Sequence, residues 1–302
     1  MLLTLIICTY KRPELLSKCI KCALPVLNEL DAELIVINDD KNSNIEVPNL
    51  KNVKLINNPK QGLASVRNLG AANANGKLLL FIDDDIEFTI KNVVDLLQHY
   101  QLNDPACYNP NWKYSDEMLQ LVNRSSFGRF IIKNGLIDYK GWVPNLNWQN
   151  KLFETSVLAG FFMLIPKEFF LRSGGFNETF INQGTEDDEL CMRLKKQNTK
   201  MFICPEIYVH HNEIDRISLE SRLARYYNGA INRRRAFDLG HQTYQIKYNK
   251  TKQFLISILL PFYNTLIGFS KLIPNQIAFD FLYFKLAHTL IALAIYKGYN
   301  KK

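Results

Sequence analysis

Short apolar runs alternate with amphipathic stretches through the first hundred residues. Four runs have the length of a strand and no alternation of polar and apolar positions: Leu2–Cys8, Leu34–Asn38, Val53–Ile56 and Leu78–Ile82. A helix is expected from Pro13, because proline suits a first helical turn, and Gly62–Asn75 carries apolar residues at helical spacing. Uninterrupted apolar strands between helices predict an α/β fold with a mostly parallel sheet flanked by helices.

Acidic and hydroxyl side chains follow three of these runs. Thr9 follows the first run, Asp39 and Asp40 follow the second, and Asp83–Asp85 follow the last. In a doubly wound sheet, ligands bind outside the carboxyl ends of the strands. These side chains are therefore expected along one rim of the sheet, at a ligand site.

The second half of the chain changes character twice. From about residue 103 to residue 150 it is polar and aromatic, which predicts long loops and short strands that set specificity. Apolar runs follow at Leu158–Ile165 and Ile203–Val209, and a helix is expected at Glu186–Lys196, with carboxylates at its N-terminus. The segment Ser218–Phe237 has a helical pattern and is basic.

Two long apolar stretches follow, Phe254–Phe269 and Ile277–Ile295. The first contains Pro261, and the second carries Asp280 and Lys285. Because a charge near the middle of a bilayer costs about 2.5–3.5 kcal/mol, these helices are expected to lie in the membrane interface rather than to span it. Helices that pack in a core or form a dimer interface are the alternative.

Charge is distributed unevenly along the chain. Residues 216–302 hold 14 Lys and Arg against three Asp and Glu, a net charge of +11, whereas the first 215 residues have a net charge of −3. A basic tail indicates an anionic partner, and its mixture with aliphatic runs favours lipid over nucleic acid. The expected partner is the inner membrane surface, and no nucleic acid is expected.

Cysteine usage favours a reducing compartment. The six cysteines are scattered, and Cys19 and Cys22, although spaced like a redox or zinc pair, fall inside a predicted helix without a second pair. Met1 leads directly into an apolar run of strand length, so no secretory signal is expected. The predicted location is cytoplasmic, peripheral on the cytoplasmic face of the membrane.

Three groups of residues are candidates for chemistry. The adjacent carboxylates of Asp83–Asp85 repel one another unless a cation neutralises them, so they could hold a divalent ion and its phosphates; a solvated turn is the alternative. One carboxylate of Glu186–Glu189 could act as a general base, or the group could merely match the helix dipole. His210 and His211 end a strand, where an imidazole could ligate a metal or be structural.

Several short motifs follow one another in a distinctive order. They are Cys8-Thr9-Tyr10-Lys11-Arg12-Pro13, Ile37-Asn38-Asp39-Asp40, Gln61-Gly62-Leu63-Ala64-Ser65-Val66-Arg67-Asn68, Phe81-Ile82-Asp83-Asp84-Asp85, Ala159-Gly160-Phe161-Phe162, Gly174-Gly175-Phe176 and Glu186–Arg193. In this order they resemble the family 2 glycosyltransferases of the GT-A fold, over about residues 1–237. The resemblance implies a nucleotide-binding part at about 1–102 and an acceptor part at about 103–237. The C-terminal amphipathic or apolar helices would occupy 238–302.

The resemblance implies a role for each matching residue. Asp187 would be the catalytic base, with Glu186 beside it. A divalent ion, Mn²⁺ or Mg²⁺, would be held by Asp83, Asp85 and either His211 or, as the second choice, His210. The nucleotide would be bound by Thr9, Tyr10, Arg12, Glu14, Asp39, Asp40, Arg67, Asp83 and Asp84.

Two positions depart from the family pattern. Lys41 follows Asp40 where the family usually has glycine, so either of the two aspartates Asp39 and Asp40 could read the base. Thr185 stands directly before the acid pair where glycine is common, so the catalytic base could lie one residue from Asp187.

The resemblance implies an inverting, metal-dependent hexosyltransferase. It would move a sugar from a nucleotide diphosphate donor, by family frequency a UDP-sugar, to a glycan or lipid-linked acceptor hydroxyl in bacterial surface polysaccharide or lipopolysaccharide synthesis. One alternative is a sugar-phosphate nucleotidyltransferase, although residues 9–13 lack the glycines of its usual loop. The other is a degenerate sugar-nucleotide-binding module, although the key carboxylates are all present.

Overall fold

A computed structural model describes residues 2–102, 105–181 and 183–301 of the chain. It divides into two compact units. The first unit comprises Met1–Ser115, Asp138–Ile181 and Glu186–Asn212, and the second comprises Asp116–Ile137, Asn182–Thr185 and Glu213–Lys302. The predicted division between 102 and 103 adjoins residues 103–104, which lie outside the described residues.

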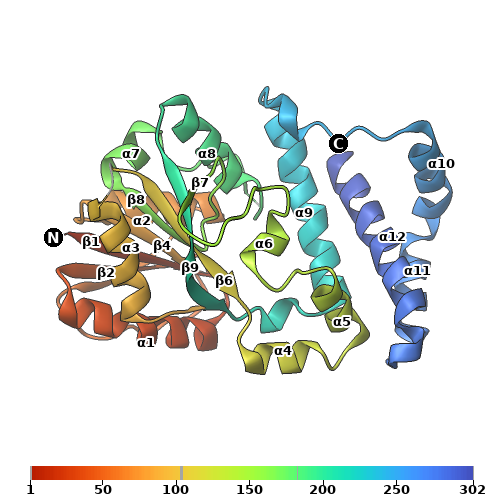
Figure 1. The fold of residues 1–302 in the computed structure, drawn as a ribbon, viewed down its shortest axis with the longest axis horizontal. Coiled ribbons are helices and arrows are strands. Elements are labelled where there is room, and N and C mark those ends of the chain that lie inside the picture. The colour runs from red at the N-terminus through yellow and green to blue at the C-terminus, as the bar shows by residue number, and fades with distance from the viewer. Residues whose placement is uncertain (1, 103–104, 182, 302) are drawn as a thin grey trace. The chain divides into compact units, whose positions relative to one another are not determined.

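A mixed sheet organises the first unit (Figure 1). Its strands are β1 (Leu3–Thr9), β2 (Ala32–Asn38), β3 (Val53–Asn57), β4 (Leu78–Asp83), β5 (Ile86–Glu87), β6 (Cys107–Lys113), β7 (Phe153–Glu154), β8 (Phe162–Pro166) and β9 (Met201–His211). The order is β3-β2-β1-β4-β8-β6-β9-β5, and β7 pairs with β9. Strands β1 to β4 run parallel to one another, so β1, β2 and β4 end at one rim. The predicted α/β fold with a mostly parallel sheet is confirmed.

Helices flank this sheet. They are α1 (Pro13–Glu29), α2 (Leu63–Asn73), α3 (Ile90–Leu102), α6 (Tyr139–Trp142), α7 (Lys167–Arg172) and α8 (Glu186–Lys196). Helices α1 and α2 pack on β1 and β2, and α3 packs on β6 and β9. Every residue of β1 and β2 is buried, which explains why their sequences show no alternation of polar and apolar residues.

The middle of the chain contains more helix than the sequence pattern predicted. Where loops and short strands were expected, the structure has β6 and α6 and two further helices, α4 (Asp116–Val122) and α5 (Ser126–Lys133). In α5, Phe127, Phe130 and Ile131 are buried at helical spacing. The prediction was wrong there because this periodic segment is only eight residues long, too short to stand out from its polar surroundings.

Strand β9 is interrupted by a bulge where it pairs with β6. Pro110 pairs with Cys204, but the next residue, Asn111, pairs with Tyr208, so residues 205–207 have no counterpart on β6. Before the bulge β9 also pairs with β7, and after it with β5. The bulge therefore separates the base of β9 from its tip, which carries the two histidines.

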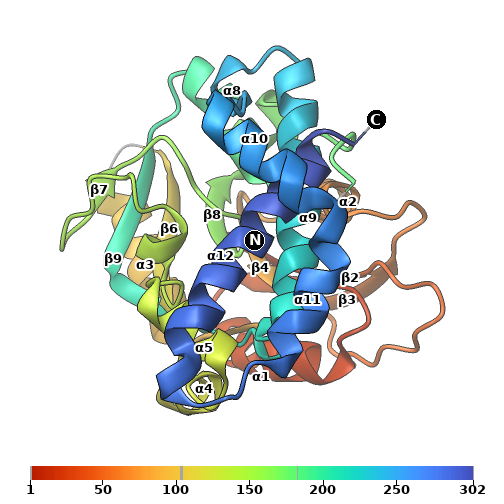
Figure 2. The ribbon, with the colours of Figure 1, turned by 90° about the vertical axis from the view of Figure 1, so that its right-hand side faces the viewer.

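The described residues of the second unit are mainly helical. Besides α4 and α5 they form η1 (Ile214–Arg216), α9 (Leu219–Asp238), η2 (Gln242–Tyr244), α10 (Lys250–Leu259), η3 (Leu260–Phe262), α11 (Tyr263–Leu272), η4 (Ile277–Phe279) and α12 (Asp280–Tyr299). Helix α12 packs against α9, α5 and α11 (Figure 2). Ala287, Leu290 and Leu293 are buried on α12, and a Cβ at Gly298 would overlap the Tyr227 carbonyl oxygen. One face of α12 is therefore a close packing face.

Many large apolar side chains are exposed on the C-terminal helices. Two segments, Lys250–Leu272 and Ile277–Tyr299, are long and apolar enough to cross a membrane by length and composition, and only 11% and 22% of their apolar windows are buried. Large exposed apolar side chains on them are Phe254, Leu255, Ile258, Phe262, Phe269, Leu272, Ile277, Phe279, Phe281 and Leu282. We call these ten side chains the apolar surface.

Candidate active site

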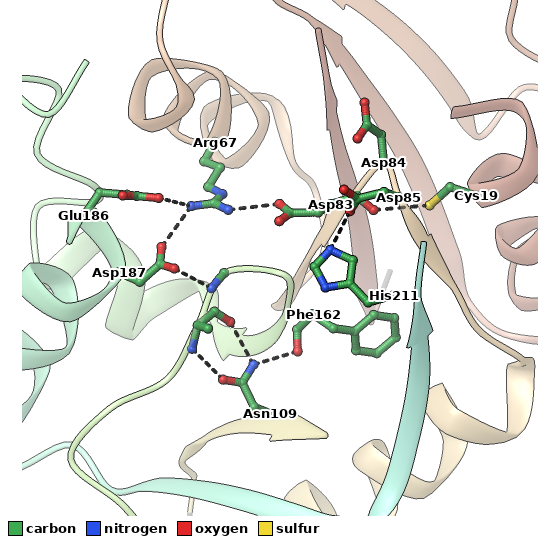
Figure 3. A network of polar contacts seen from close by, with 12 residues as sticks. Cys19, Arg67, Asp83, Asp84, Asp85, Asn109, Phe162, Glu186, Asp187 and His211 are labelled. Carbon is green, nitrogen blue, oxygen red and sulfur yellow. Dashed lines mark hydrogen bonds and ion pairs between the residues drawn. The ribbon is translucent and has the colours of Figure 1, made fainter. Parts of the chain in front are cut away.

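Polar and charged side chains gather at the rim of the sheet in two groups. Figure 3 shows the first group, together with Asp84, Asp85 and His211 of the second. The Arg67 group consists of Arg67, Asp83, Glu186 and Asp187, and the Arg12 group consists of Thr9, Arg12, Asp84, Asp85 and His211. The three consecutive aspartates at the end of β4 link the two groups. The structure thus brings together most of the site residues predicted from the sequence.

In the Arg67 group, one guanidinium binds three carboxylates. Its Nη2 lies 3.0 Å from Asp83 Oδ1, and its Nη1 lies 2.9 Å from Asp187 Oδ1 and 3.2 Å from Glu186 Oε1. Burial lowers the pKa of Arg67, but the three carboxylates outweigh burial and hold that pKa above its ordinary value. The charged guanidinium therefore ties the end of β4 to the start of α8.

Arg67 is confined by a glycine and an aromatic ring. Its guanidinium carbon lies 5.1 Å from the centroid of the Phe176 ring, and a Cβ at Gly160 would lie 2.6 Å from the same carbon. Asn68 fixes Phe176, because its side chain accepts a hydrogen bond from the Phe176 N–H at 2.8 Å and donates one to the Phe176 carbonyl at 2.9 Å. Three of the sequence motifs therefore converge on one guanidinium.

Asp187 is oriented through both of its carboxylate oxygens. Oδ1 accepts a hydrogen bond from Arg67, and Oδ2 accepts one from the Gly160 N–H at 2.9 Å. Burial, together with the charge of Asp83, raises the pKa of Asp187, although Arg67 and the Gly160 N–H act in the opposite direction. A carboxylate with a raised pKa is a stronger proton acceptor.

The acidic side chains at the start of α8 differ in their exposure to solvent. The Asp187 side chain is 22% exposed, whereas that of Glu186 is 2% exposed. Glu189 is 5% exposed and forms an ion pair with Arg193 within the helix, at 2.7 Å. Of these three carboxylates, Asp187 is the one that a substrate can reach.

In the Arg12 group, two buried aspartates share one guanidinium. Arg12 Nη1 lies 2.9 Å from Asp85 Oδ2 and 3.2 Å from Asp84 Oδ1, and the Thr9 hydroxyl donates to Asp84 Oδ2 at 2.7 Å. Burial and the neighbouring Asp85 raise the pKa of Asp84 to about 7, against the opposite effects of Arg12 and Thr9. The crowded acids therefore favour a cation beside them.

Asp85 and His211 fit a shared divalent ion. Asp85 Oδ1 lies 3.0 Å from His211 Nε2, and both side chains are fully buried. A carboxylate oxygen and an imidazole nitrogen are both donors that manganese or magnesium can accept, so these two side chains could hold such an ion. No group of three His, Cys, Asp or Glu side chains suited to a metal occurs in the described residues, and Asp83 faces Arg67 instead. The chain would therefore supply two ligands, Asp85 and His211, to such an ion.

Aromatic rings enclose His211. The ring centroids of Trp112 and Trp142 lie 5.0 and 5.3 Å from that of His211, and the Phe161 ring stacks at 6.4 Å. This packing fixes the imidazole so that Nε2 faces Asp85. The two tryptophans come from the aromatic middle segment, which its composition predicts to set specificity.

His210 lies away from this site. Successive side chains of a strand point to opposite faces, and His210 pairs in register with Glu87 while His211 pairs with Ile86. His210 lines a cavity of ≈ 530 Å³ together with Cys22 and Tyr208 among others. The structure does not bring His210 to the acid triplet.

Asp39 and Asp40 have different surroundings. The Asp39 carboxylate accepts hydrogen bonds from Asn58 Nδ2 at 2.7 Å and the Gly62 N–H at 3.0 Å, and it remains partly exposed. Asp40 is 8% exposed and accepts from the Asn42 N–H in the turn after β2. Of the two, Asp39 is the one accessible to a ligand.

The remaining predicted residues lie at the surface. Tyr10 is 47% exposed in the loop between β1 and α1, and Glu14 is exposed in the first turn of α1. Neither contributes to the two charged groups, although both adjoin Arg12 in the chain.

Two residues without a role in the sequence analysis organise the loop before β8. Asn109 is fully buried on β6, and its side chain accepts from the Ala159 N–H at 2.7 Å and donates to the carbonyls of Ala159 and Phe162. Gly160 donates to Asp187 and contacts Arg67. These bonds hold residues 159–161 as a loop, so strand β8 begins at Phe162, within the apolar run Leu158–Ile165.

Thr185 has an unusual backbone conformation. Its φ is 82°, a region that β-branched residues rarely adopt and glycine adopts readily. Thr185 therefore holds a strained backbone conformation directly before the first acid of α8.

The comparison with known families agrees with this geometry. The model of "Glycosyl transferase family 2" matches residues 4–171, more than half of the chain. The chain therefore belongs to glycosyl transferase family 2. A second model, the N-terminal domain of galactosyltransferase, matches residues 146–216.

Curated relatives are more distant. The chain is 27% identical over 167 residues to putative polypeptide N-acetylgalactosaminyltransferase 13 of Drosophila melanogaster, and 24% identical over 170 residues to N-acetylgalactosaminyltransferase 6 of the same organism. These matches cover 52% and 53% of this chain but only 29% and 24% of the relatives. The chain thus spans less than a third of the length of these relatives.

Solved structures share the fold. Mannosyltransferase PcManGT of Pyrobaculum calidifontis, in complex with GDP-Man and Mn²⁺, superposes with a TM-score of 0.57 at 13% identity, over 99% of this chain and 88% of that one. GalNAc-T7 with UDP, GalNAc and Mn²⁺ gives a TM-score of 0.50 at 15% identity, over 70% and 44%. These likenesses confirm the GT-A fold.

Proposed function

We propose that this chain is an inverting glycosyltransferase that moves a sugar from a nucleotide diphosphate donor to an acceptor hydroxyl. The observation that carries the proposal is the Arg67 group, in which one guanidinium joins the acid triplet of β4 to Asp187. The acid triplet suits a phosphate-bound cation, and Asp187 is a partly exposed carboxylate with a raised pKa. Displacement of the diphosphate in a single step requires a donor site and a proton acceptor close together, and both lie on this rim.

The reaction follows from these positions. The acceptor oxygen attacks the anomeric carbon opposite the diphosphate, the bond between that carbon and the phosphate oxygen breaks, and Asp187 takes the acceptor proton. The configuration at the anomeric carbon is inverted, and no covalent intermediate with the protein forms. Arg67 and the Gly160 N–H hold Asp187 in the orientation that the transfer needs.

The rim would bind the rest of the donor. Asp39 would accept hydrogen bonds from the base, Thr9, Tyr10 and Glu14 would line the nucleotide pocket, and Asp83 would contact the ribose. Asp85 and His211 would hold a manganese or magnesium ion, which supplies positive charge to the departing diphosphate when bound.

A UDP-sugar is the proposed donor, with a hexose or N-acetylhexosamine as the sugar. The names of the Drosophila relatives and the UDP bound in GalNAc-T7 support this choice, whereas the GDP-Man in the archaeal mannosyltransferase makes guanine the competing base. The acceptor proposed is a glycan or a lipid-linked hydroxyl in bacterial surface polysaccharide or lipopolysaccharide synthesis.

A donor panel tests the proposal. Wild-type protein should bind one class among UDP- and GDP-sugars, at least about ten-fold more tightly with Mn²⁺ than without it, and should slowly hydrolyse that donor. Asp85→Asn should lose the manganese-dependent part of binding, measured by calorimetry, because one of the two ion ligands loses its charge. Asp95→Asn, an acid-to-amide change on α3 that is paired with Lys91, is the matched control and should bind normally.

Two results would count against the site. Equal donor affinity with and without Mn²⁺ in both proteins would exclude the ion-dependent donor site. A folded wild type that binds no donor would instead favour a degenerate sugar-nucleotide-binding module.

We further propose that residues 1–237 form the catalytic part and residues 238–302 attach it to the cytoplasmic face of a membrane. The apolar surface supports this proposal, because large apolar side chains are exposed at ten positions of these helices and extensive exposed apolar surface marks interaction sites. One face of α12 packs on α9, so only the opposite face of α12 can contact lipid. Helix α9 itself carries five arginines. This arrangement favours helices that lie in the interface over helices that span.

Vesicle binding tests the attachment. The triple variant Phe254→Ser/Phe262→Ser/Phe281→Ser should sediment with phosphatidylglycerol vesicles at least about ten-fold less than wild type, because each ring loses its burial in lipid. All three side chains are more than half exposed, so the fold should be unaffected. Leu171→Ser, at a side chain 57% exposed in the first unit, is the control. Unchanged sedimentation of the triple variant would exclude the apolar surface as the membrane contact.

A further inference from the structure

Arg12 acts as a counter-ion inside the acid triplet. Its Nη1 contacts Asp85 Oδ2 at 2.9 Å and Asp84 Oδ1 at 3.2 Å. The other oxygen of Asp85, Oδ1, lies within hydrogen-bond distance of His211 Nε2, at 3.0 Å, and these two side chains are the proposed ligands of the divalent ion. The guanidinium and the proposed ion would therefore share one carboxylate.

We propose that Arg12 competes with the divalent ion for Asp85 when no donor is bound, and transfers to the donor diphosphate when donor and ion bind together. This inference rests on the proposed function and adds a coupling device to it. Its consequence is that the ion and the nucleotide bind cooperatively, each weakly without the other.

Electrostatics supports the competition. The side chain of Asp85 is fully buried and that of Asp84 is 5% exposed, so water and salt screen the charges there only weakly. A divalent ion between Asp85 and His211 would be repelled by the guanidinium on the other oxygen of the same carboxylate. A diphosphate that arrives with the ion brings enough negative charge to satisfy both cations.

Arg12 is placed where it can move, and Arg67 is not. The Arg12 side chain is 21% exposed and lies at the start of α1, directly before Pro13, whereas the Arg67 side chain is 3% exposed between Gly160 and Phe176. A planar guanidinium binds phosphate oxygens in bidentate geometry as well as it binds carboxylates. Arg12 can therefore exchange one anion for the other by a side-chain movement.

Direct metal titration tests the inference without catalysis. Mn²⁺ binding would be followed by electron paramagnetic resonance in wild type and Arg12→Gln, first without nucleotide and then with UDP. We expect Arg12→Gln to bind Mn²⁺ alone about ten-fold more tightly than wild type, and UDP to strengthen Mn²⁺ binding less in the variant than in wild type. Lys11→Gln removes an exposed cation one residue away and should leave both affinities unchanged.

Further measurements keep the test decisive. Arg12→Lys keeps the charge at this position and should bind Mn²⁺ as wild type does. If Arg12→Gln is less stable, Mn²⁺ should raise its melting temperature more than that of wild type. Mn²⁺ affinity in Arg12→Gln that is equal to or weaker than that of wild type would overturn the inference. The proposed transferase would fail separately, through the absence of donor binding in the panel described above.

Discussion

Asp187→Asn is expected to lower kcat by about 10²- to 10⁴-fold while the donor still binds. The amide keeps the size of the side chain but accepts no proton at neutral pH, so the acceptor hydroxyl loses its base. Because burial raises the pKa of Asp187, the acid limb of the wild-type pH–rate profile should lie above the range of an ordinary aspartate. The carboxylate is active when deprotonated, so activity should fall as the pH decreases through this raised pKa.

Steady-state kinetics and donor calorimetry on the same proteins check this expectation. Asp188→Asn is the matched control, because it changes the next carboxylate on α8, and its kcat should stay within a few fold of wild type. A reversed result, with Asp188→Asn inactive and Asp187→Asn active, would move the base by one residue along the helix. Normal activity in both variants would remove the general base from the proposed mechanism.

Gly160→Ala is expected to reduce kcat/KM by about 10²-fold and to destabilise the first unit by about 1–3 kcal/mol. The new methyl group would lie 2.6 Å from the guanidinium carbon of Arg67, so Arg67 must move. Arg67 holds Asp83 and Asp187 together, and its displacement would therefore disturb the donor end and the base at once. The backbone N–H that binds Asp187 is retained in the variant.

Activity assays and thermal unfolding measure the two effects. Gly229→Ala on α9 is the control, because a Cβ there meets nothing within 4 Å, and this substitution should leave activity unchanged and raise stability by up to about 1 kcal/mol, since alanine favours a helix interior. Full activity in Gly160→Ala would mean that the position of Arg67 is not critical for the reaction.

Much of the first unit was predictable from the sequence. Strands β1, β2 and β4 each contain a mostly apolar run of strand length, and this pattern predicts a strand that is buried on both faces. The acids that follow β4 had to lie on the rim, since parallel strands end on the same side. The start of α8 was equally clear from its four acids.

The pairings between side chains in the site could not be predicted, because they join residues that are far apart in the sequence. The pairing of Arg67 with Asp83, Glu186 and Asp187 joins residues up to 120 positions apart. Likewise, the assignment of His211 rather than His210 depends on which face of β9 meets Asp85, and that face depends on the register with β5. Asn109 bonds to backbone groups of residues 159–162, and Gly160 bonds to Asp187 through its own N–H, and the motif at residues 159–162 indicates neither contact.

The bulge in β9 gives this register a particular consequence. Before the bulge, Ile203 and Cys204 are buried and pair with β6. After it, Tyr208, Val209 and His210 pair with β6 in a shifted register, and His210 and His211 pair with β5. Because successive side chains of a strand point to opposite faces, a change of one residue in the length of segment 205–207 is expected to reverse the faces on which His210 and His211 lie. The length of the bulge, and not only the identity of either histidine, would thus select which ring reaches the acids.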